Sequence, residues 1–448
     1  LSYASWLCSI QKKDGSWYDT ADKAPYVFDT AQILKGLLEI RKLNPDVDEA
    51  VKKGCGWILS CMDQNGRLVT PDKSQWGEDG ECSELIHLYC LEPLYTAASA
   101  YGEEVYKQGA DRIKRYYIDS YRDKILDFGF LSHFYAYVLE ALYDIGEIEL
   151  LKEAMKGIEA LQREDGMVPA YKNVNWGCST GLFQLALVWY KLGNLERGNK
   201  AFRYACSLQN ETGGWYGSYA SISNPDIKNE AEYPRYFARS EISWAVKYFL
   251  DALSFKCRLE FEQQSSHFLD GIEKEDGRYQ LVLNEIRRTS AEKVCDVGCG
   301  KGRYLHNLQE DAKGICYYAV DLSARVMEAI KGPVEKKQGS LTQIPYADES
   351  FDVVYTAEAL EHAICTENAL KELLRVTKPG GSVVVIDKNE SARGLLALEE
   401  WEQWFDDEFF MEFSRKNHCS LEIERNLPYE GGVQDGLFSG WILRKNQE

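Results

Sequence analysis

The sequence predicts a two-domain protein with an all-α N-terminal half and an α/β C-terminal half that contains a mostly parallel sheet. Three observations support this prediction. The chain has 448 residues, which is long enough for two or three hydrophobic cores. Residues 1–256 carry a repeating helical pattern. From Glu292 onward, short apolar runs alternate with amphipathic helices, a pattern typical of α/β folds and assigned here to a domain at 257–448.

The N-terminal half repeats with a period of about 50 residues. Four stretches share a helix end, a polar or acidic turn and a glycine: 10–17, 60–66, 161–166 and 208–215. An apolar helix follows each turn, at 29–43, 83–101, 179–192 and 240–253, and residues 113–145 supply a further unit. The pattern therefore predicts five helical hairpins, which can stack as an open solenoid or close into a ring.

Two of these turns carry a recognisable motif. Residues 11–17 read Gln-x-x-Asp-Gly-x-Trp, and residues 209–215 read Gln-x-x-x-Gly-x-Trp. They resemble the Q-x-x-x-G-x-W repeat of the terpenoid cyclase and protein prenyltransferase toroids. This resemblance implies an α/α toroid over roughly the first 255 residues, with no activity attached, because the D-x-D-D acid of the cyclases is absent from the helical half.

Aromatic residues are abundant near the turns of this half. Trp17, Trp176 and Trp215 each stand beside a glycine or a polar turn. Such rings can stack on a sugar or pack on a lipid chain, although core filling is the alternative for each of them. We therefore expect the toroid to bind or orient a ligand.

Composition limits the classes of partner. A net charge of -19 argues against nucleic acid, which needs a basic surface. No apolar run approaches the length of a membrane helix and no signal peptide opens the chain, so we expect a cytoplasmic protein. Thirteen cysteines without C-x-x-C pairs indicate reduced thiols. Cys82, His87 and Cys90 come nearest to a metal cluster, but a buried helix face explains them better, and no metal is expected.

A glycine-rich turn organises the C-terminal half. An apolar strand at 294–297 leads into Gly298, Gly300 and Gly302, and a helix begins at Arg303. A ligand can lie directly on such a backbone, between a strand end and a helix start. Asp321 ends the next apolar run about 20 residues later, where an acid can bind the ribose hydroxyls. The turn misses the dinucleotide fingerprint G-x-G-x-x-G by one residue, and a turn without ligand is the alternative.

The remaining strands complete the predicted sheet. Strands are expected at 294–297, 317–320, 334–338, 351–356 and 381–386. Two further runs, 420–425 and 438–444, are joined by a loop that contains Gly431 and Gly432. They predict a terminal hairpin that places an antiparallel strand at the sheet edge, for seven strands in all. A helix at 267–288, within a charged connector at 257–290, is expected to cover the sheet as a lid.

Six short motifs in order resemble the class I S-adenosylmethionine-dependent methyltransferases, over roughly residues 270–448. They lie at 296–302, 320–321, 339–345, 351–355, 357–362 and 374–381. The match is closest to the small-molecule enzymes with a D-x-G-C-G-x-G first motif. The resemblance implies a Rossmann-like fold, S-adenosylmethionine as the cofactor and methyl transfer as the reaction.

The resemblance also assigns roles by position. It implies cofactor contacts for Asp296, Gly298, Cys299, Gly300, Gly302, Asp321, Leu322, Ser340, Leu341 and Ala357. Asp321 would bind the ribose and Leu322 would line the adenine. Ser340 stands where the family usually has aspartate, which weakens the contact to the adenine amino group. If the acceptor is a hydroxyl, a base is needed, and His362 and Glu358 are the candidates, with helix capping or cofactor binding as the alternative role.

These features lead to one principal hypothesis. The chain is expected to methylate a small-molecule or carrier-linked acceptor, with oxygen the favoured target, while the toroid recruits or shapes that acceptor. Alternatively, the toroid docks a protein or peptide, or is a separate lyase, hydrolase or cyclase. A central cavity with paired carboxylates, such as Asp29 or Glu84, would favour a second active site, and a filled ring would favour docking. The sequence leaves the oligomeric state open.

Overall fold

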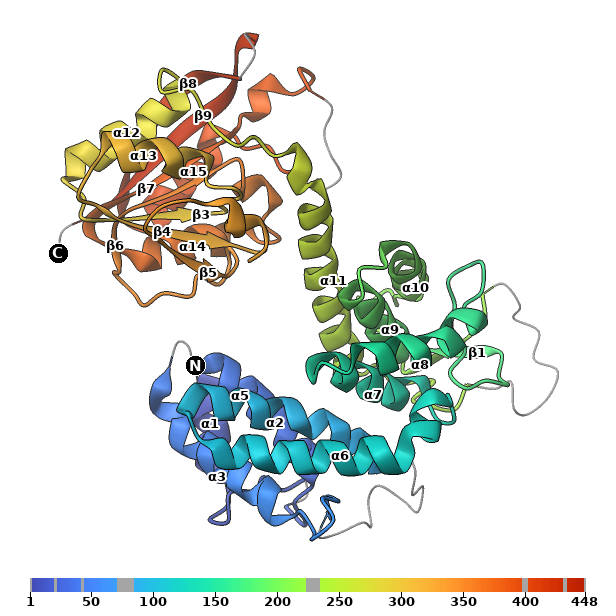
Figure 1. Cartoon of the computed structure of the whole chain (residues 1–448). Helices are drawn as coiled ribbons and strands as arrows, with labels where there is room; N and C mark the ends of the chain where they lie inside the picture. Colours follow the sequence, from blue (N-terminus) through green and yellow to red (C-terminus); the bar gives the residue numbers. More distant parts are fainter. Residues whose placement is uncertain are drawn as a thin grey trace. The chain divides into compact units, whose positions relative to one another are not determined.

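The computed structural model describes residues 2–19, 22–41, 44–70, 84–222, 234–396, 402–429 and 433–446. The chain divides into two compact units, Leu1–Leu259 and Glu260–Glu448. The division falls inside one helix, α11 (Ser243–Gln264), close to the boundary expected near 257 (Figure 1). Each unit has a hydrophobic core of its own.

The N-terminal unit is built mainly of helices. In chain order these are α1 (Ser2–Ile10), α2 (Val27–Ile40), η1 (Pro45–Val47), α3 (Asp48–Ser60), η2 (Ile86–Cys90), α5 (Leu91–Tyr101), α6 (Glu104–Leu126), α7 (Ser132–Asp144), α8 (Ile148–Leu161), α9 (Ser179–Lys191), α10 (Leu195–Ser207) and α11. Two short strands, β1 (Trp176–Cys178) and β2 (Ser218–Ala220), pair antiparallel and were not predicted. In the described residues the helices follow one another as hairpins at the predicted places. Closure into a toroid stays a prediction.

Helices α7 and α9 are more deeply buried than α8, which lies between them in the chain. Twelve of the thirteen residues of α9 are buried, and ten of the thirteen in α7. In contrast, α8 buries five of its fourteen residues. A helix that is buried on all sides lies inside a core, whereas a one-sided helix lies at the surface. Helices α7 and α9 are therefore inner helices, whereas α3, α6, α8 and α10, which bury fewer than half of their residues, are called outer helices.

The repeated turns hold neighbouring outer helices together. Their glycines have positive φ angles, 98° at Gly15, 98° at Gly66 and 96° at Gly166. A Cβ atom at any of them would overlap the backbone carbonyl of the next outer helix, at Lys53, Arg112 and Lys200 respectively. The glutamines add hydrogen bonds, since Gln11 Nε2 donates to Ala50 O at 2.8 Å and Gln162 Nε2 donates to Arg197 O at 3.0 Å. The repeated motif is thus a structural joint.

The three tryptophans proposed to stack on a ligand belong to the core. Trp17 and Trp215 are each 1% exposed and Trp176 is 2% exposed. The indole of Trp17 donates to Leu7 O, and that of Trp215 donates to Ala205 O, both at 2.8 Å. The ligand-stacking hypothesis is wrong for these residues, because their rings are buried in the core and have no face exposed for a ligand.

The C-terminal unit contains one sheet of seven strands. They are β3 (Lys293–Val297), β4 (Cys316–Asp321), β5 (Val334–Gln338), β6 (Phe351–Ala357), β7 (Thr377–Lys388), β8 (Cys419–Tyr429) and β9 (Val433–Lys445). The order across the sheet is β5-β4-β3-β6-β7-β9-β8. The first five strands pair in parallel, and β9 runs antiparallel to both β7 and β8. The predicted Rossmann-like, mostly parallel seven-stranded sheet is confirmed.

The terminal hairpin inserts differently from the prediction. The antiparallel strand β9 lies inside the sheet, and β8 forms the edge. The reason lies in the side chains: Trp441, Ile442 and Leu443 of β9 are all buried, as a strand covered on both faces requires, whereas Glu422 and Glu424 of β8 are exposed. The glycines at 431 and 432 lie outside the described residues.

Helices cover both faces of this sheet. Helices α12 (Gly277–Thr289) and α13 (Arg303–Asp311) pack on one face, and α14 (Thr366–Val376) and α15 (Asp407–Lys416) pack on the other (Figure 1). The lid helix predicted from residue 267 begins only at 277. Asp276 is the N-cap of α12, and its side chain accepts a hydrogen bond from Arg278 N at 2.8 Å. This N-cap was not predicted from the sequence.

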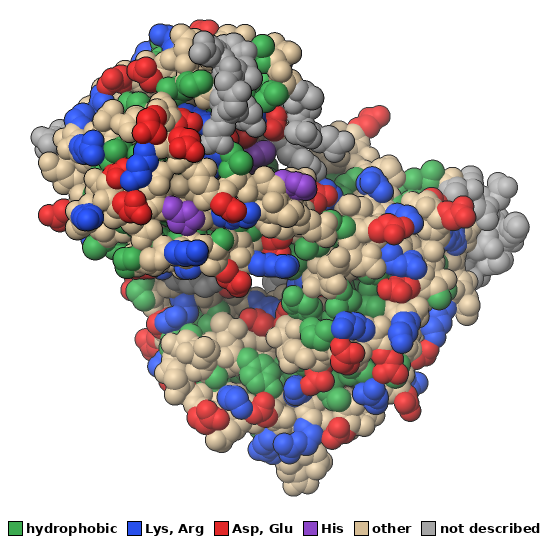
Figure 2. Space-filling view, turned by 45° about the horizontal axis from the view of Figure 1, so that its top comes forward, with side chains coloured by type: hydrophobic (Ala, Val, Ile, Leu, Met, Phe, Trp, Pro, Cys, Tyr) green, Lys and Arg blue, Asp and Glu red, His purple; other side chains and the backbone are tan. Residues whose placement is uncertain are grey.

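Several composition-based expectations bear on the described residues. Acidic and basic side chains are interspersed on the face shown in Figure 2. No helix among them combines the length and apolarity needed to cross a bilayer. The described cysteines are free thiols. His87 and Cys90 are buried, and His87 Nδ1 lies 2.9 Å from Tyr117 Oη, while Cys82 lies outside the described part of the chain.

Candidate functional site

The glycine turn joins β3 to α13. Gly298, Gly300 and Gly302 have φ angles of 80°, 51° and 75°, a left-handed backbone that favours glycine. A Cβ atom at Gly298 would overlap the side chain of Ala359, which follows β6. The turn is therefore held close against the loop of the neighbouring strand, and its glycine backbone, called the cradle, lies at the carboxyl edge of the sheet.

Asp321, at the end of β4, is tied to this turn. Its Oδ2 accepts a hydrogen bond from Gly300 N at 2.9 Å, and its Oδ1 accepts one from Ser323 N at 2.9 Å. Burial raises the pKa of its carboxyl group. Two backbone donors thus fix the orientation of the carboxylate, and each oxygen keeps a lone pair with which it can accept a hydrogen bond from a hydroxyl group.

Asp296 lies beneath the turn, at the end of β3. It is buried, and its Oδ2 accepts a hydrogen bond from Tyr355 Oη at 2.9 Å. Burial, with the charge of Asp321 as a lesser cause, raises the pKa of Asp296 to about 7. A buried carboxyl group of this kind favours a positively charged neighbour, because such a neighbour stabilises its ionised form.

Glu358 follows β6 with a positive φ of 56°. Its Oε1 accepts a hydrogen bond from Arg278 Nη1 at 2.9 Å and a second one from Arg303 Nη2. Arg278 is fully buried and is also paired with Asp276. Two guanidinium groups therefore hold this carboxylate, and they link helices α12 and α13 to the end of β6.

His362 lies in the short helix η6 (Leu360–His362), which follows the same strand. Its Nε2 is 3.5 Å from Glu361 Oε1, and its side chain is partly exposed. Glu361 is buried, and its Oε2 lies 2.5 Å from Lys388 Nζ. Asp387 Oδ2 accepts the backbone N–H of Glu361 at 3.0 Å. The end of β7 thereby fixes η6, and burial raises the pKa of Glu361 to about 7.

The other predicted residues surround the same edge. Ala357 ends β6, and Cys299 is buried inside the glycine turn. Leu322 O accepts a hydrogen bond from Gln338 Nε2 at 2.8 Å. Ser340 and Leu341 follow β5, where Ser340 Oγ lies 3.1 Å from Thr342 Oγ1. Because β5, β4, β3 and β6 are consecutive neighbours in the sheet, their carboxyl ends bring all the predicted residues to one edge.

Sequence reasoning missed three contributors. Arg278 was not singled out, although it anchors Glu358. Phe261 and Glu262, from the last turn of α11, contact His362 and Ser323 respectively. The only sequence signal was the charged connector at 257–290, which gives no indication of which of its side chains face the sheet.

The interior of the N-terminal unit is filled with aromatic rings. Ring centroids lie 4.9 Å apart for Phe28 and Tyr137, 5.0 Å for Tyr89 and Tyr137, and 6.0 Å for Tyr137 and Tyr248. Glu84 is held by Arg67 and by Tyr117 Oη. Among the described contacts, Glu84 is thus bound by an arginine and a tyrosine and not by a second carboxylate.

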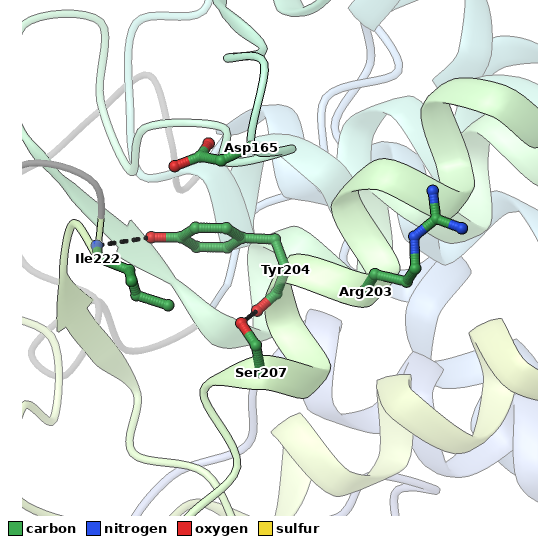
Figure 3. Close-up of a pocket in the computed structure, with 5 residues that line it drawn as sticks. All are labelled: Asp165, Arg203, Tyr204, Ser207 and Ile222. Atoms are coloured by element: carbon green, nitrogen blue, oxygen red, sulfur yellow. Dashed lines mark hydrogen bonds between the residues drawn. The ribbon is translucent and has the colours of Figure 1, made fainter.

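A small hollow of about 300 Å³ lies elsewhere in this unit. Its lining residues are Asp165, Arg203, Tyr204, Ser207 and Ile222 (Figure 3). The Tyr204 hydroxyl accepts a hydrogen bond from Ile222 N at 3.2 Å, and Arg203 extends away from the tyrosine ring (Figure 3). None of the predicted site residues lines it.

The C-terminal edge fits an adenosine cofactor. The cradle requires glycine at Gly298 and Gly302, where side-chain atoms of Ala359 and Ile330 would collide with a Cβ atom. The carboxylate of Asp321 is oriented for a diol, and Asp296 favours a cationic group.

Comparison with known proteins agrees with this fit. Residues 295–385 match the family described as the methyltransferase domain. The chain is 33% identical over 181 residues to the chloroplastic tocopherol O-methyltransferase of Arabidopsis thaliana, covering 38% of this chain and 51% of that protein. It is 33% identical over 108 residues to the malonyl-(acyl-carrier protein) O-methyltransferase of Erwinia pyrifoliae, covering 23% of this chain and 40% of that protein. The chain thus spans about half the length of these curated relatives or less.

Among solved structures, a SAM-dependent methyltransferase of Thermotoga maritima, a possible histamine N-methyltransferase, is 21% identical with a TM-score of 0.31 and covers 42% of this chain and 95% of its own. Two observations do not depend on that structural likeness: the strand order of this chain's sheet and the family match over residues 295–385. They show a methyltransferase domain at residues 295–385 of the C-terminal unit, of the kind that uses S-adenosylmethionine as its cofactor.

Proposed function

We propose that the whole chain transfers a methyl group from S-adenosylmethionine to a small-molecule or carrier-linked acceptor, with oxygen as the favoured target atom. The observation that carries this proposal is the hydrogen bond between Gly300 N and Asp321 Oδ2, which joins the glycine cradle to the ribose-binding acid at one sheet edge. The names of the matched relatives include a tocopherol and a malonyl-carrier O-methyltransferase, which supports an oxygen acceptor.

Each residue at the carboxyl edge of the sheet is proposed to contact a different part of the cofactor. Asp321 would bind the ribose hydroxyls, Leu322 would line the adenine, and the glycine backbone would hold the methionyl part with Asp296 below it. Ser340 can offer the adenine amino group only a hydroxyl, which is a weaker acceptor than the aspartate usual in the family. When bound, the cofactor supplies an electrophilic methyl group on a positively charged sulfur.

The protein's own contribution to the reaction is alignment and deprotonation. Alignment of the acceptor with the methyl carbon can lower the barrier by several kcal/mol, up to about 7 to 11 kcal/mol in ideal cases. We assign the proton-accepting role to His362, because it is partly exposed at this edge and Glu361 lies beside its ring. Glu358 is less suited to it, since two arginines bind its carboxylate.

The helical unit is proposed to recruit the acceptor. Its aromatic interior is packed and Glu84 is paired, which supports docking in preference to a second catalytic centre. Docking of a protein or peptide partner is therefore the second candidate role for this unit.

Calorimetry with S-adenosylhomocysteine tests the cofactor site. Gly300 has a positive φ and donates to Asp321, so Gly300→Val should abolish binding. Gly314→Val is the matched control, because Gly314 also has a positive φ but a Cβ atom there meets open space. Binding by Gly300→Val at the wild-type level would refute the site.

Incubation of the full chain with S-adenosylmethionine and metabolite pools, followed by a search for mass gains of one methyl group, would identify the acceptor.

A further inference from the structure

The segment that follows the division between the two units lies against the cofactor edge. We call residues 260–272 the clasp: they comprise the last turn of α11, the short helix η4 (Ser265–His267) and the loop after it. The clasp belongs to the C-terminal unit. Its side chains and carbonyls contact three different elements around the proposed cofactor site.

The first contact is at the ribose-binding loop. Glu262 Oε1 accepts a hydrogen bond from Ser323 Oγ at 2.7 Å, and Ser323 is fully buried. The backbone N–H of Ser323 in turn donates to Asp321 Oδ1 at 2.9 Å. One serine therefore connects the clasp to the acid that would bind the ribose.

The second contact is at the proposed base. The ring centroid of Phe261 lies 5.0 Å from that of His362, with an angle of 70° between the ring planes. Phe261 and Glu262 are adjacent in the chain, so a single helical turn reaches both the ribose loop after β4 and the η6 loop after β6. The proposed base and the ribose acid therefore flank the same turn of helix.

The third contact is at the glycine turn. Lys301 Nζ donates to Phe268 O at 3.0 Å and lies 2.9 Å from Asp270 Oδ1. The Phe268 ring lies 3.8 Å from where a Cβ atom on Gly300 would stand. The loop is anchored further along α13, where Asn307 Nδ2 donates to Ile272 O at 2.7 Å.

We infer that the clasp closes over the bound cofactor and that Glu262 is the positioning residue that fastens it, through Ser323, to the ribose-binding loop. The inference rests on the proposed function, since it assigns residues to the same site. A fastened clasp covers the cofactor on the side away from the sheet, which removes water from the site and slows release. Binding of the cofactor and order in residues 260–272 should therefore increase together.

A double-mutant cycle with S-adenosylhomocysteine in the full chain tests the hydrogen bond. Glu262→Ala and Ser323→Ala should each weaken binding by about 10- to 150-fold, the loss typical of one hydrogen bond to a charged group. The double variant should bind about as weakly as the weaker single variant, because both changes remove the same bond. Glu262→Gln should bind within about 3-fold of wild type, since its amide oxygen can still accept from the serine. Glu275→Ala, an exposed carboxylate of the same connector, is the control and should bind as wild type does.

Hydrogen exchange separates failure of the clasp from failure of the cofactor site. Glu262→Ala should speed exchange of amides 260–272 even without ligand, and S-adenosylhomocysteine should slow that exchange in wild type but not in the variant. If wild type binds the ligand while Glu262→Ala binds equally well or more tightly, or the two single effects add, the clasp is refuted and the cofactor site stands. If wild type fails to bind the ligand, the proposed function is refuted. If amides 260–272 of ligand-free Glu262→Ala exchange at the wild-type rate, the role of Glu262 in holding the clasp is refuted.

Discussion

At the scale of single residues, the site is defined by carboxylates in unequal surroundings. Asp321 is oriented by two backbone donors, Asp296 lies buried with one tyrosine, and Glu358 is held by two arginines. The sequence alone makes all three look alike as acids after strands. Their partners distinguish Asp321, the proposed ribose ligand, from Asp296, whose ionised form a cationic neighbour would stabilise, and from Glu358, which anchors two helices.

Asp296 predicts a particular pH dependence of stability. Its pKa in the folded protein is raised to about 7, so between pH 4 and pH 7 the folded state retains a proton that the unfolded state loses. The contribution of Asp296 to the stability of the ligand-free protein is therefore fully present below about pH 4 and is lost as the pH rises through 7, by up to roughly 4 kcal/mol at 1.4 kcal/mol for each pKa unit.

Asp296→Asn should remove this fall, because the amide does not titrate and can still accept the Tyr355 hydrogen bond. Denaturant unfolding at pH 5, 6, 7 and 8 measures the difference between variant and wild type, which should grow with pH. Glu275→Gln, at an exposed position, should show no such trend. A constant difference across the range would contradict the prediction.

At the scale of elements, the sequence predicted strands better than contacts. The β5 limits agree with the prediction, and β3, β4 and β6 differ from it by one or two residues, because buried parallel strands are short apolar runs with polar ends. The start of α12 was missed, since the N-cap at Asp276 is one acid among many in a charged connector. The order of β8 and β9 depends on which strand buries both faces, which local patterning does not reveal.

The helical repeat also shows that local sequence patterns predict elements but not their contacts. Its turns were predicted, but their tryptophans were taken as candidates for ligand binding, whereas they are buried against neighbouring helices. Burial there depends on contacts between hairpins that lie far apart in the sequence. The packing of the hairpins is therefore stabilised by tryptophans that the sequence pattern had indicated as candidate ligand-binding residues.

The contact between the Gly166 turn and α10 predicts that alanine at Gly166 lowers stability more than alanine at Gly193. Gly166 has a φ of 96°, and a Cβ atom there would overlap the Lys200 carbonyl of α10. Gly166→Ala should therefore lower the thermal stability of the N-terminal unit by more than about 2 kcal/mol, the sum of backbone strain and a forced shift of α10.

Gly193→Ala is the matched control. Gly193 has a φ of 77°, but a Cβ atom there meets open space, so only the strain of about 1 kcal/mol remains. Scanning calorimetry and limited proteolysis of both variants would measure the difference. Equal destabilisation would show that the contact with α10 adds nothing to the backbone term.

At the scale of the whole molecule, the chain combines a helical unit, in whose described part Glu84 is bound by Arg67, with a second unit that carries the proposed cofactor site. All the residues proposed to contact the cofactor lie after residue 260, within the C-terminal unit. The proposal that the helical unit recruits the acceptor therefore assigns it no contact with the cofactor.

If the helical unit recruits the acceptor, its removal should reduce methyl transfer but not cofactor binding. A fragment of residues 257–448 retains the clasp, the glycine turn and Asp321, so it should bind S-adenosylhomocysteine within a few-fold of the full chain. Its methyl transfer to the acceptor identified with the full chain should fall by 100-fold or more at low acceptor concentration, because about 3 kcal/mol of docking energy would be lost. Adding more acceptor should restore turnover, since recruitment raises local concentration without altering the aligned site. Titration calorimetry and initial rates across acceptor concentrations measure both effects. Equal rates for fragment and full chain at low acceptor would contradict recruitment, whereas loss of cofactor binding by the fragment would place part of the cofactor site before residue 257.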